Sequence, residues 1–253
     1  MSVLSILLIG LFLPLFPLSI IFNQALKRVK NPLARSGILL IWPVPGILAS
    51  VITDLLVTPW MLTWAALTAL LYGFRLLTQR EIHGWIGFLA TAVWSLLWFP
   101  LVTGISFQSL VGYALAISIP LVMLAWLAVE LEQRFGVAYT HLYRGLPNTM
   151  PRFSGVLVFC ILAAIATPVF PSFFIMLKVL LSATPALAII ILLAWLTWSW
   201  AGIRLLQGLL VGEDSHYKAH TERTDINKSK AWSYALILVV LTIVGLYVTG
   251  DMS

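Results

Sequence analysis

Apolar residues run in long unbroken stretches along this chain, separated by short segments that carry nearly all of its charges. A bilayer core about 30 Å thick needs about 20 apolar residues per helix, and eight stretches are close to or above that length. None of them alternates apolar and polar residues, which argues against a membrane β-barrel. The sequence therefore predicts an all-α integral membrane protein with about eight transmembrane helices. The predicted helices cover residues 3–24, 37–57, 59–77, 85–102, 110–129, 153–181, 185–206 and 231–249.

The composition excludes a soluble fold. Apolar residue types make up 61% of the 253 residues and charged types only 9%, against roughly 45–50% and about 25% in soluble domains. Cys160 is the only cysteine, so no disulfide framework exists. Eleven tryptophans suit a bilayer protein, in which we expect the indole rings to lie at the headgroup level. The first apolar stretch lacks a basic start and a cleavage site, and we interpret it as a retained helix.

The basic residues indicate an orientation. All of the 15 Lys and Arg residues except Lys178 lie in, or at the edge of, the odd-numbered loops between the predicted helices. Because basic residues collect in cytoplasmic loops, both termini are expected outside, in a multi-pass protein of the cell inner (cytoplasmic) membrane. The same rule explains the net charge of +6 without a nucleic-acid partner, since no basic stripe carries base-stacking aromatic residues outside the apolar stretches.

Ionisable residues avoid the middle of every predicted helix. Asp54 and Lys178 are both expected near the outer interface, where they would pair or face a common vestibule. Glu130 and Glu132 follow the fifth helix at its inner end, and Arg204 lies near the inner end of the seventh. A proton or cation that crosses hydrocarbon needs groups at mid-depth that can hold it. The sequence therefore predicts no charge relay within this chain.

The sixth predicted helix contains an interruption signal, because Thr167, Pro168, Pro171 and Ser172 lie within residues 153–181. Two prolines three residues apart remove two backbone donors and clash with the preceding turns, so the helix is expected to kink or break. A simple proline kink is one interpretation. The other is a discontinuous helix of the kind that transporters place beside a substrate path, in which Ser118 would be a further polar candidate.

Other chemistry is scarce. We find no phosphate-binding glycine loop, no zinc-type cysteine pair and no Ser/His/Asp arrangement, so we predict no catalytic, cofactor or metal residues. His216 and His220 are four residues apart in a mixed-charge loop, where a solvated role is favoured over a metal site. His83 is expected to lie in a cytoplasmic loop without an acidic partner. These absences argue against catalysis by this chain alone.

The second half of the chain resembles a known family. The run HLYRGLPNTMPRF at residues 141–153, the following break, and LAVELEQRFG at residues 127–136 are similar to the proton-translocating, antiporter-like membrane subunits of respiratory complex I and multisubunit cation/proton antiporters. The resemblance covers about residues 110–250. It implies one transmembrane domain over residues 1–253, with four N-terminal helices in 1–108 and four antiporter-like helices in 109–253.

The departures from that family are specific. The family's histidine before the loop is matched by Ser118 followed by Ile119, and its glutamate or lysine after the break is matched by Ile175 and Met176. Family members are longer, and a central channel-forming repeat is expected to be largely missing here. The resemblance therefore implies the family's fold without its charged relay.

These observations favour a reduced antiporter-like subunit with a structural or coupling role in a multisubunit complex. That complex would serve inorganic-carbon (CO2 or bicarbonate) uptake or be complex I-like. The expected partners are the lipid bilayer, a full-length antiporter-like subunit and/or a soluble cytoplasmic subunit, with no cofactor. Two alternatives stay open: an autonomous small secondary transporter with its site at the broken sixth helix, and an assembly or lipid-packing factor.

Overall fold

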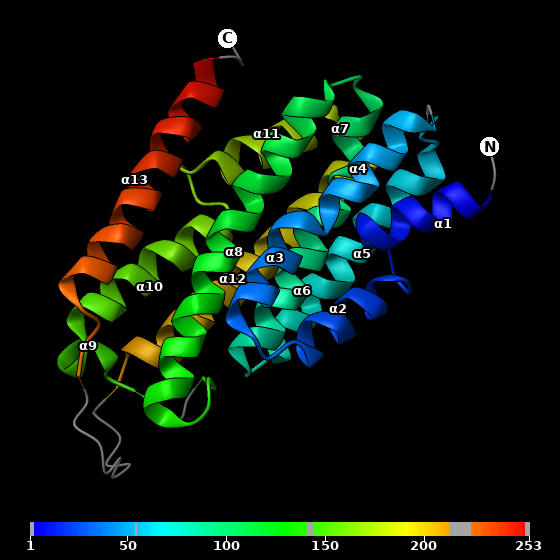
Figure 1. Cartoon of the computed structure of the whole chain (residues 1–253). Helices are drawn as coiled ribbons and strands as arrows, with labels where there is room; N and C mark the ends of the chain where they lie inside the picture. Colours follow the sequence, from blue (N-terminus) through cyan, green and yellow to red (C-terminus); the bar gives the residue numbers. More distant parts are fainter. Residues whose placement is uncertain (1–2, 54, 141–143, 213–223, 251–253) are drawn as a thin grey trace.

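The computed structural model describes residues 3–53, 55–140, 144–212 and 224–250, and almost all of these are helical (Figure 1). Glu81 and Tyr139 form an isolated antiparallel bridge, the one β-type pairing among the described residues. The helices are α1 (Val3–Phe12), α2 (Ser19–Arg28), α3 (Pro32–Ile41), α4 (Pro43–Ile52), α5 (Pro59–Thr78), α6 (Ile82–Ser95), α7 (Trp98–Val102), α8 (Phe107–Phe135), α9 (Leu146–Thr149), α10 (Pro151–Ala164), α11 (Pro171–Ser182), α12 (Pro185–Leu210) and α13 (Lys228–Gly250).

Six of the eight predicted membrane helices are long and apolar enough to cross a bilayer in the described part of the chain. They include Pro32–Ile52, which comprises α3 and α4, and Ile82–Val102, which comprises α6 and α7. The remaining two predicted helices are each divided into two short ones, α1 with α2 and α10 with α11. The all-α membrane fold is therefore confirmed. The expectation of a single discontinuous helix is wrong, because the first helix is also interrupted.

The bundle has a buried centre and a loosely attached edge. In an apolar 18-residue stretch of Ile82–Val102, 83% of the residues are buried, whereas only 17% are buried in the corresponding stretch of Lys228–Tyr247. A helix that is apolar all round and lacks charges is suited to burial among other helices. Figure 1 shows α13 along the edge of the bundle, far from α1. The central helices are therefore fixed on all sides, whereas α13 contacts mainly α10 and α11.

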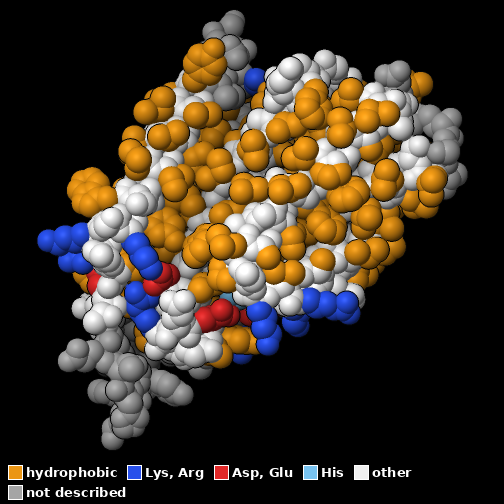
Figure 2. Space-filling model, viewed as in Figure 1, with side chains coloured by type: hydrophobic (Ala, Val, Ile, Leu, Met, Phe, Trp, Pro, Cys, Tyr) orange, Lys and Arg blue, Asp and Glu red, His pale blue; other side chains and the backbone are white. Residues whose placement is uncertain are grey.

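Helices from the two halves of the sequence pack against each other. α12 lies along α5, and α8 contacts α3, α6 and α10. Charged side chains gather at one end of the molecule, while its flank is almost entirely apolar (Figure 2). Such a surface fits a lipid environment with one polar interface. The assignment of that charged end to the cytoplasm stays a prediction.

Candidate functional site

The two interrupted helices share a short sequence. Residues 14–17 read Pro-Leu-Phe-Pro between α1 and α2, and residues 168–171 read Pro-Val-Phe-Pro between α10 and α11. In both places the prolines cannot supply backbone N–H donors, so the helical hydrogen bonds stop. We call residues 13–18 the first break and residues 165–170 the second break. The common Pro-x-Phe-Pro pattern was the signal that could have identified the first break from the sequence.

Indole N–H groups donate hydrogen bonds to free backbone carbonyl groups at the first break. A carbonyl left without a partner in a membrane interior is costly, so such groups need donors from neighbouring helices. Three tryptophans supply them: Trp42 Nε1 to the Leu11 oxygen (3.1 Å), Trp98 Nε1 to the Leu13 oxygen (3.1 Å) and Trp64 Nε1 to the Phe16 oxygen (2.6 Å). The donors come from three separate helical segments, and therefore tie the break to the bundle.

The second break is satisfied in a related way. The Ile165 carbonyl accepts hydrogen bonds from Trp195 Nε1 and Trp198 Nε1, both at 3.3 Å. The Thr167 hydroxyl donates to the Leu162 oxygen at 3.0 Å, and the Ser172 hydroxyl donates to the Ala163 oxygen at 2.8 Å. The candidate polar residues of this break therefore bind the backbone of their own interrupted helix.

A glycine of another helix lies directly against each break. A Cβ atom on Gly46 of α4 would lie 2.9 Å from Phe12 Cβ and 3.2 Å from the Leu13 nitrogen. A Cβ atom on Gly245 of α13 would lie 2.6 Å from the Val169 oxygen and 3.0 Å from the Pro171 nitrogen. Small residues permit this close backbone approach between membrane helices. Both breaks are consequently packed against helix backbone.

Neutral polar groups continue from the first break toward the charged end. The Ser19 hydroxyl is 2.9 Å from the Tyr72 hydroxyl, and Asn23 Nδ2 donates to Thr91 Oγ1 at 2.9 Å. Asn23 and Tyr72 also line a cavity of about 320 Å³ that reaches Arg35 and His83. A polar recess therefore extends from the charged end toward the first break, but its inner part carries no charge among the residues described.

His83 and Glu132 form a polar contact at the charged end. His83 Nε2 lies 2.9 Å from Glu132 Oε1, and Nη1 of the buried Arg35 lies 2.6 Å from His83 Nδ1 and 2.9 Å from Nε2. The expectation that His83 has no acidic partner is therefore wrong. The partner is distant in sequence, because α6 and α8 become neighbours only in the folded bundle.

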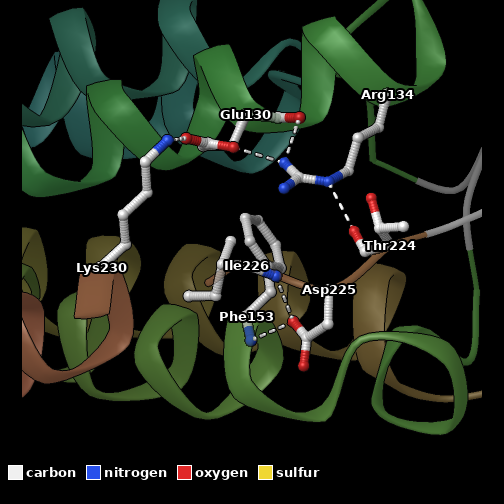
Figure 3. A network of polar contacts seen from close by, with 7 residues as sticks. All are labelled: Glu130, Arg134, Phe153, Thr224, Asp225, Ile226 and Lys230. Carbon is white, nitrogen blue, oxygen red and sulfur yellow. Dashed lines mark hydrogen bonds and ion pairs between the residues drawn. The ribbon is translucent and has the colours of Figure 1, made fainter. Parts of the chain in front are cut away.

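Glu130 belongs to a second polar network, which fastens α13 to the bundle (Figure 3). Its carboxylate binds Arg134 on α8 and Lys230 on α13, the latter at 2.7 Å. Asp225, just before α13, accepts hydrogen bonds from the Arg152 and Phe153 backbone nitrogens at the start of α10. A carboxylate at a helix N-terminus accepts hydrogen bonds from the free N–H groups and interacts favourably with the positive end of the helix dipole. These contacts make Glu130 a structural residue.

The remaining candidates lie apart from one another. Lys178 Nζ donates to the Tyr113 hydroxyl at 3.2 Å, and Arg204 donates to the Leu77 oxygen at 3.3 Å. The Ser118 hydroxyl is buried without a hydrogen-bond partner among the described residues. Asp54 lies outside the described residues, so its pairing with Lys178 stays a prediction; His216 and His220 lie outside them as well. The candidate residues therefore form no single converging site.

Some tryptophans have a role besides the expected one. Trp85, Trp94, Trp98 and Trp198 are fully buried in the bundle, whereas Trp60, Trp200 and Trp232 are exposed; the headgroup-level position of the exposed rings stays a prediction. The ring nitrogens of Trp98 and Trp198 act as donors at the two breaks. Position in an apolar stretch separates only Trp94 and Trp198, which lie well inside residues 85–102 and 185–206, from interfacial anchors near the end of a span.

The solved structures that share this fold include chains of three membrane complexes. A chain of the respiratory complex I from Thermus thermophilus with bound NADH matches with a TM-score of 0.75 and 18% identity, over 94% of this chain and 53% of its own. A chain of the membrane-bound sulfane sulfur reductase, an archaeal respiratory membrane complex, matches with a TM-score of 0.77 and 17% identity over 96% and 52%. A chain of the Mrp complex from Dietzia sp. DQ12-45-1b matches with a TM-score of 0.77 and 14% identity, over 96% of this chain and 55% of its own.

The chain thus has a fold found in chains of respiratory and Mrp membrane complexes, and it spans about half the length of the chains it matches. The resemblance read from residues 110–250 is confirmed at the level of the fold. The structural match is wider than that resemblance, since it includes the N-terminal helices. No protein-family model and no curated protein sequence matches the chain.

Proposed function

We propose that this chain is a reduced antiporter-like membrane subunit with a structural or coupling role in a multisubunit ion-coupled complex. In this role it conducts no ions by itself and packs beside a full-length antiporter-like subunit. The proposal places the chain in the cell inner membrane with both termini outside. It assigns no catalysis to the chain alone.

The observation that carries this proposal is the chemistry of the two breaks. Among the described residues, indole and hydroxyl groups bind the free backbone groups at both breaks, and no side chain of Asp, Glu, Lys, Arg or His does so. An indole N–H neither gains nor loses a proton at physiological pH, so it cannot relay one. Residues that would carry charge after the second break are replaced by the buried Ile175 and Met176.

The autonomous transporter is less well supported by the geometry. It requires polar groups that converge on a substrate cavity at the second break. The hydroxyls of Thr167 and Ser172 instead bind carbonyl groups of α10, and the adjoining cavity is lined almost entirely by apolar side chains. A substrate with polar groups would find few partners there.

Two measurements test the proposal. A tagged copy is extracted from native membranes in mild detergent, and we expect it to co-elute with a longer antiporter-like subunit. The purified chain in proteoliposomes is expected to leave an imposed pH gradient intact, with a protonophore added afterwards as the positive control. Elution of the chain alone as a monodisperse species, or collapse of the gradient before the protonophore is added, contradicts the proposal.

The identity of the co-eluting proteins decides between the two kinds of complex. A soluble cytoplasmic zinc protein is expected for inorganic-carbon uptake, since the antiporter-like subunits of such uptake complexes are paired with one. Redox subunits are expected for a complex I-like assembly. The absence of both, with a full-length antiporter-like subunit present, favours a cation/proton antiporter assembly.

A further inference from the structure

A large apolar groove lies between α10 and α13. Its volume is about 910 Å³, near the upper end of the roughly 300–1,000 Å³ typical of ligand pockets. Val156, Phe159 and Leu162 line it on α10, and Leu238 and Val239 line it on α13. Its floor includes Thr167–Phe170 of the second break. The groove is therefore a surface of the molecule that faces the hydrocarbon layer.

The groove exists because α13 is attached near its two ends. Lys230 binds Glu130 near the start of α13, and Gly245 lies against the backbone of the second break near its end. The lining residues on α13 extend from Lys228 to Thr242, a distance of about 21 Å at 1.5 Å per residue. One leaflet of a bilayer core is about 15 Å deep, so the groove is long enough for an extended acyl chain.

Positive charge is confined to one end of the groove. Arg152 and Lys228 line that end, both side chains are exposed, and neither forms an ion pair with a described carboxylate. The Arg152 guanidinium donates to the Ile226 oxygen at 3.2 Å, which leaves most of its donors unused. Asp225 is nearby, but its oxygens accept backbone N–H groups. Trp232 lines the groove just beyond Lys228, and its ring is 74% exposed.

We propose that this groove binds an anionic phospholipid. The phosphate of the lipid interacts with Arg152 and Lys228, and one acyl chain lies along α10 and α13 as far as the second break. The groove matches the two parts of a phospholipid, because two cations lie at one end where the phosphate would bind and apolar walls line the rest where the acyl chain would lie. An apolar helix as occupant would leave these two cations without a counter-charge, whereas basic pockets between membrane helices characteristically bind anionic headgroups.

Gly155 offers a way to block the acyl chain without disturbing the bundle. It lines the groove, and a Cβ atom built on it meets nothing within 4 Å. Gly155→Phe is therefore expected to fill the groove while the protein stays folded. Gly112→Phe is the matched control, because Gly112 on α8 also has open space around its Cβ and does not line the groove.

The experiment is a lipid titration of the full chain in detergent, with binding of phosphatidylglycerol and phosphatidylcholine measured by native mass spectrometry. We expect the double substitution Arg152→Ala/Lys228→Ala to weaken phosphatidylglycerol binding about thirtyfold, since each basic residue contributes about fivefold to attraction of anionic lipid. Gly155→Phe is expected to weaken it at least tenfold. Arg28→Ala/Lys30→Ala, which removes the same charge elsewhere, and Gly112→Phe are expected to leave it within about twofold of the wild type. Thermal unfolding of each variant verifies that it is folded.

Three results would overturn the proposal. Equal affinity for the two lipids would mean that the headgroup is not recognised. Loss of binding in the charge variant but not in Gly155→Phe would place the lipid on the surface and outside the groove. A transmembrane helix of a co-purified subunit that cross-links to position 235 in the groove, with no effect of the three groove substitutions on lipid binding, would identify a protein occupant. None of these results depends on whether the chain conducts ions.

Discussion

The two breaks have the same Pro-x-Phe-Pro sequence but different surroundings. Each break has a buried and an exposed part: Leu13–Leu15 are buried and Phe16 and Pro17 exposed at the first, where donors arrive from three separate helical segments. At the second break Ile165 and Ala166 are buried, whereas Pro168 and Val169 are exposed and form part of the floor of the groove beside α13. The prolines interrupt both helices, whereas the neighbouring helices decide whether the break lies beside a groove.

This difference assigns different roles to the two breaks. The buried part of the first break lies against α4 and the buried α6–α7 region, so the backbone carbonyl groups freed there act as attachment points for the centre of the bundle. The second borders α13, the least buried of the long helices described. At the edge of the bundle it offers apolar surface in the groove and one backbone contact through Gly245. Stability should therefore depend more on the first break, and contacts with lipid or partner subunits more on the second.

The largest expected effect comes from the indole donors. Trp98→Phe removes the donor to the Leu13 carbonyl and leaves a small cavity, and we expect a loss of about 2–4 kcal/mol in the free energy of unfolding. Trp198→Phe is the matched substitution at the second break, where Trp195 still donates to the same Ile165 carbonyl. We expect it to cost about 1–2 kcal/mol less than Trp98→Phe, because no carbonyl is left bare.

The two variants are compared by unfolding in detergent, monitored by far-UV circular dichroism because this signal reports the helix content and not tryptophan fluorescence. Trp200→Phe serves as the control, since Trp200 is 61% exposed and its substitution should change stability little. Equal destabilisation by Trp98→Phe and Trp198→Phe would show that ring volume, and not the hydrogen bond, dominates. The proposed difference between the breaks would then be lost.

A smaller effect is expected from the two glycines that contact the breaks. Gly245→Ala places a methyl group 2.6 Å from the Val169 oxygen, so α13 must shift away, at a cost of about 1–3 kcal/mol typical of overpacking. Gly46→Ala meets a side-chain carbon and a backbone nitrogen at the first break, and a cost of similar size is expected. Hydrogen exchange should distinguish them: Gly245→Ala increases exchange in α13 alone, whereas Gly46→Ala affects α1 and α4.

Gly37→Ala is the control for both glycine variants. Nothing lies within 4 Å of its Cβ position on α3, so the substitution is expected to stabilise the helix by up to about 1 kcal/mol through helix propensity. If Gly245→Ala also stabilises the protein, then α13 is not held against the second break as described.

The sequence was sufficient for the membrane class and the helices, but not for the contacts between helices. Length and hydropathy located the eight segments because the bilayer imposes a fixed span. Pro168 and Pro171 predict the second break because they lie within an unusually long apolar stretch, whereas Pro14 and Pro17 lie within one of normal length, which hydropathy alone predicts to be a single helix. The pairing of His83 with Glu132 and the donation by Trp98 connect residues that are far apart in the chain. Such pairs depend on helix packing, which hydropathy does not encode.

The smallest effect is expected from the relief of backbone strain at Val169, which distinguishes the breaks once more. Among the described non-glycine residues, positive φ angles occur at Ala166 (61°) and Val169 (94°), both in the second break and none in the first. A β-branched residue is strongly disfavoured there, so Val169→Gly is expected to stabilise the protein by about 1 kcal/mol despite the added chain entropy. Leu15→Gly, at the matching position of the first motif, removes a fully buried side chain and is expected to destabilise it by at least about 2–5 kcal/mol. Opposite signs in the two unfolding curves support the distinction, whereas destabilisation by Val169→Gly would mean that packing of the valine at the edge of the groove outweighs its strain.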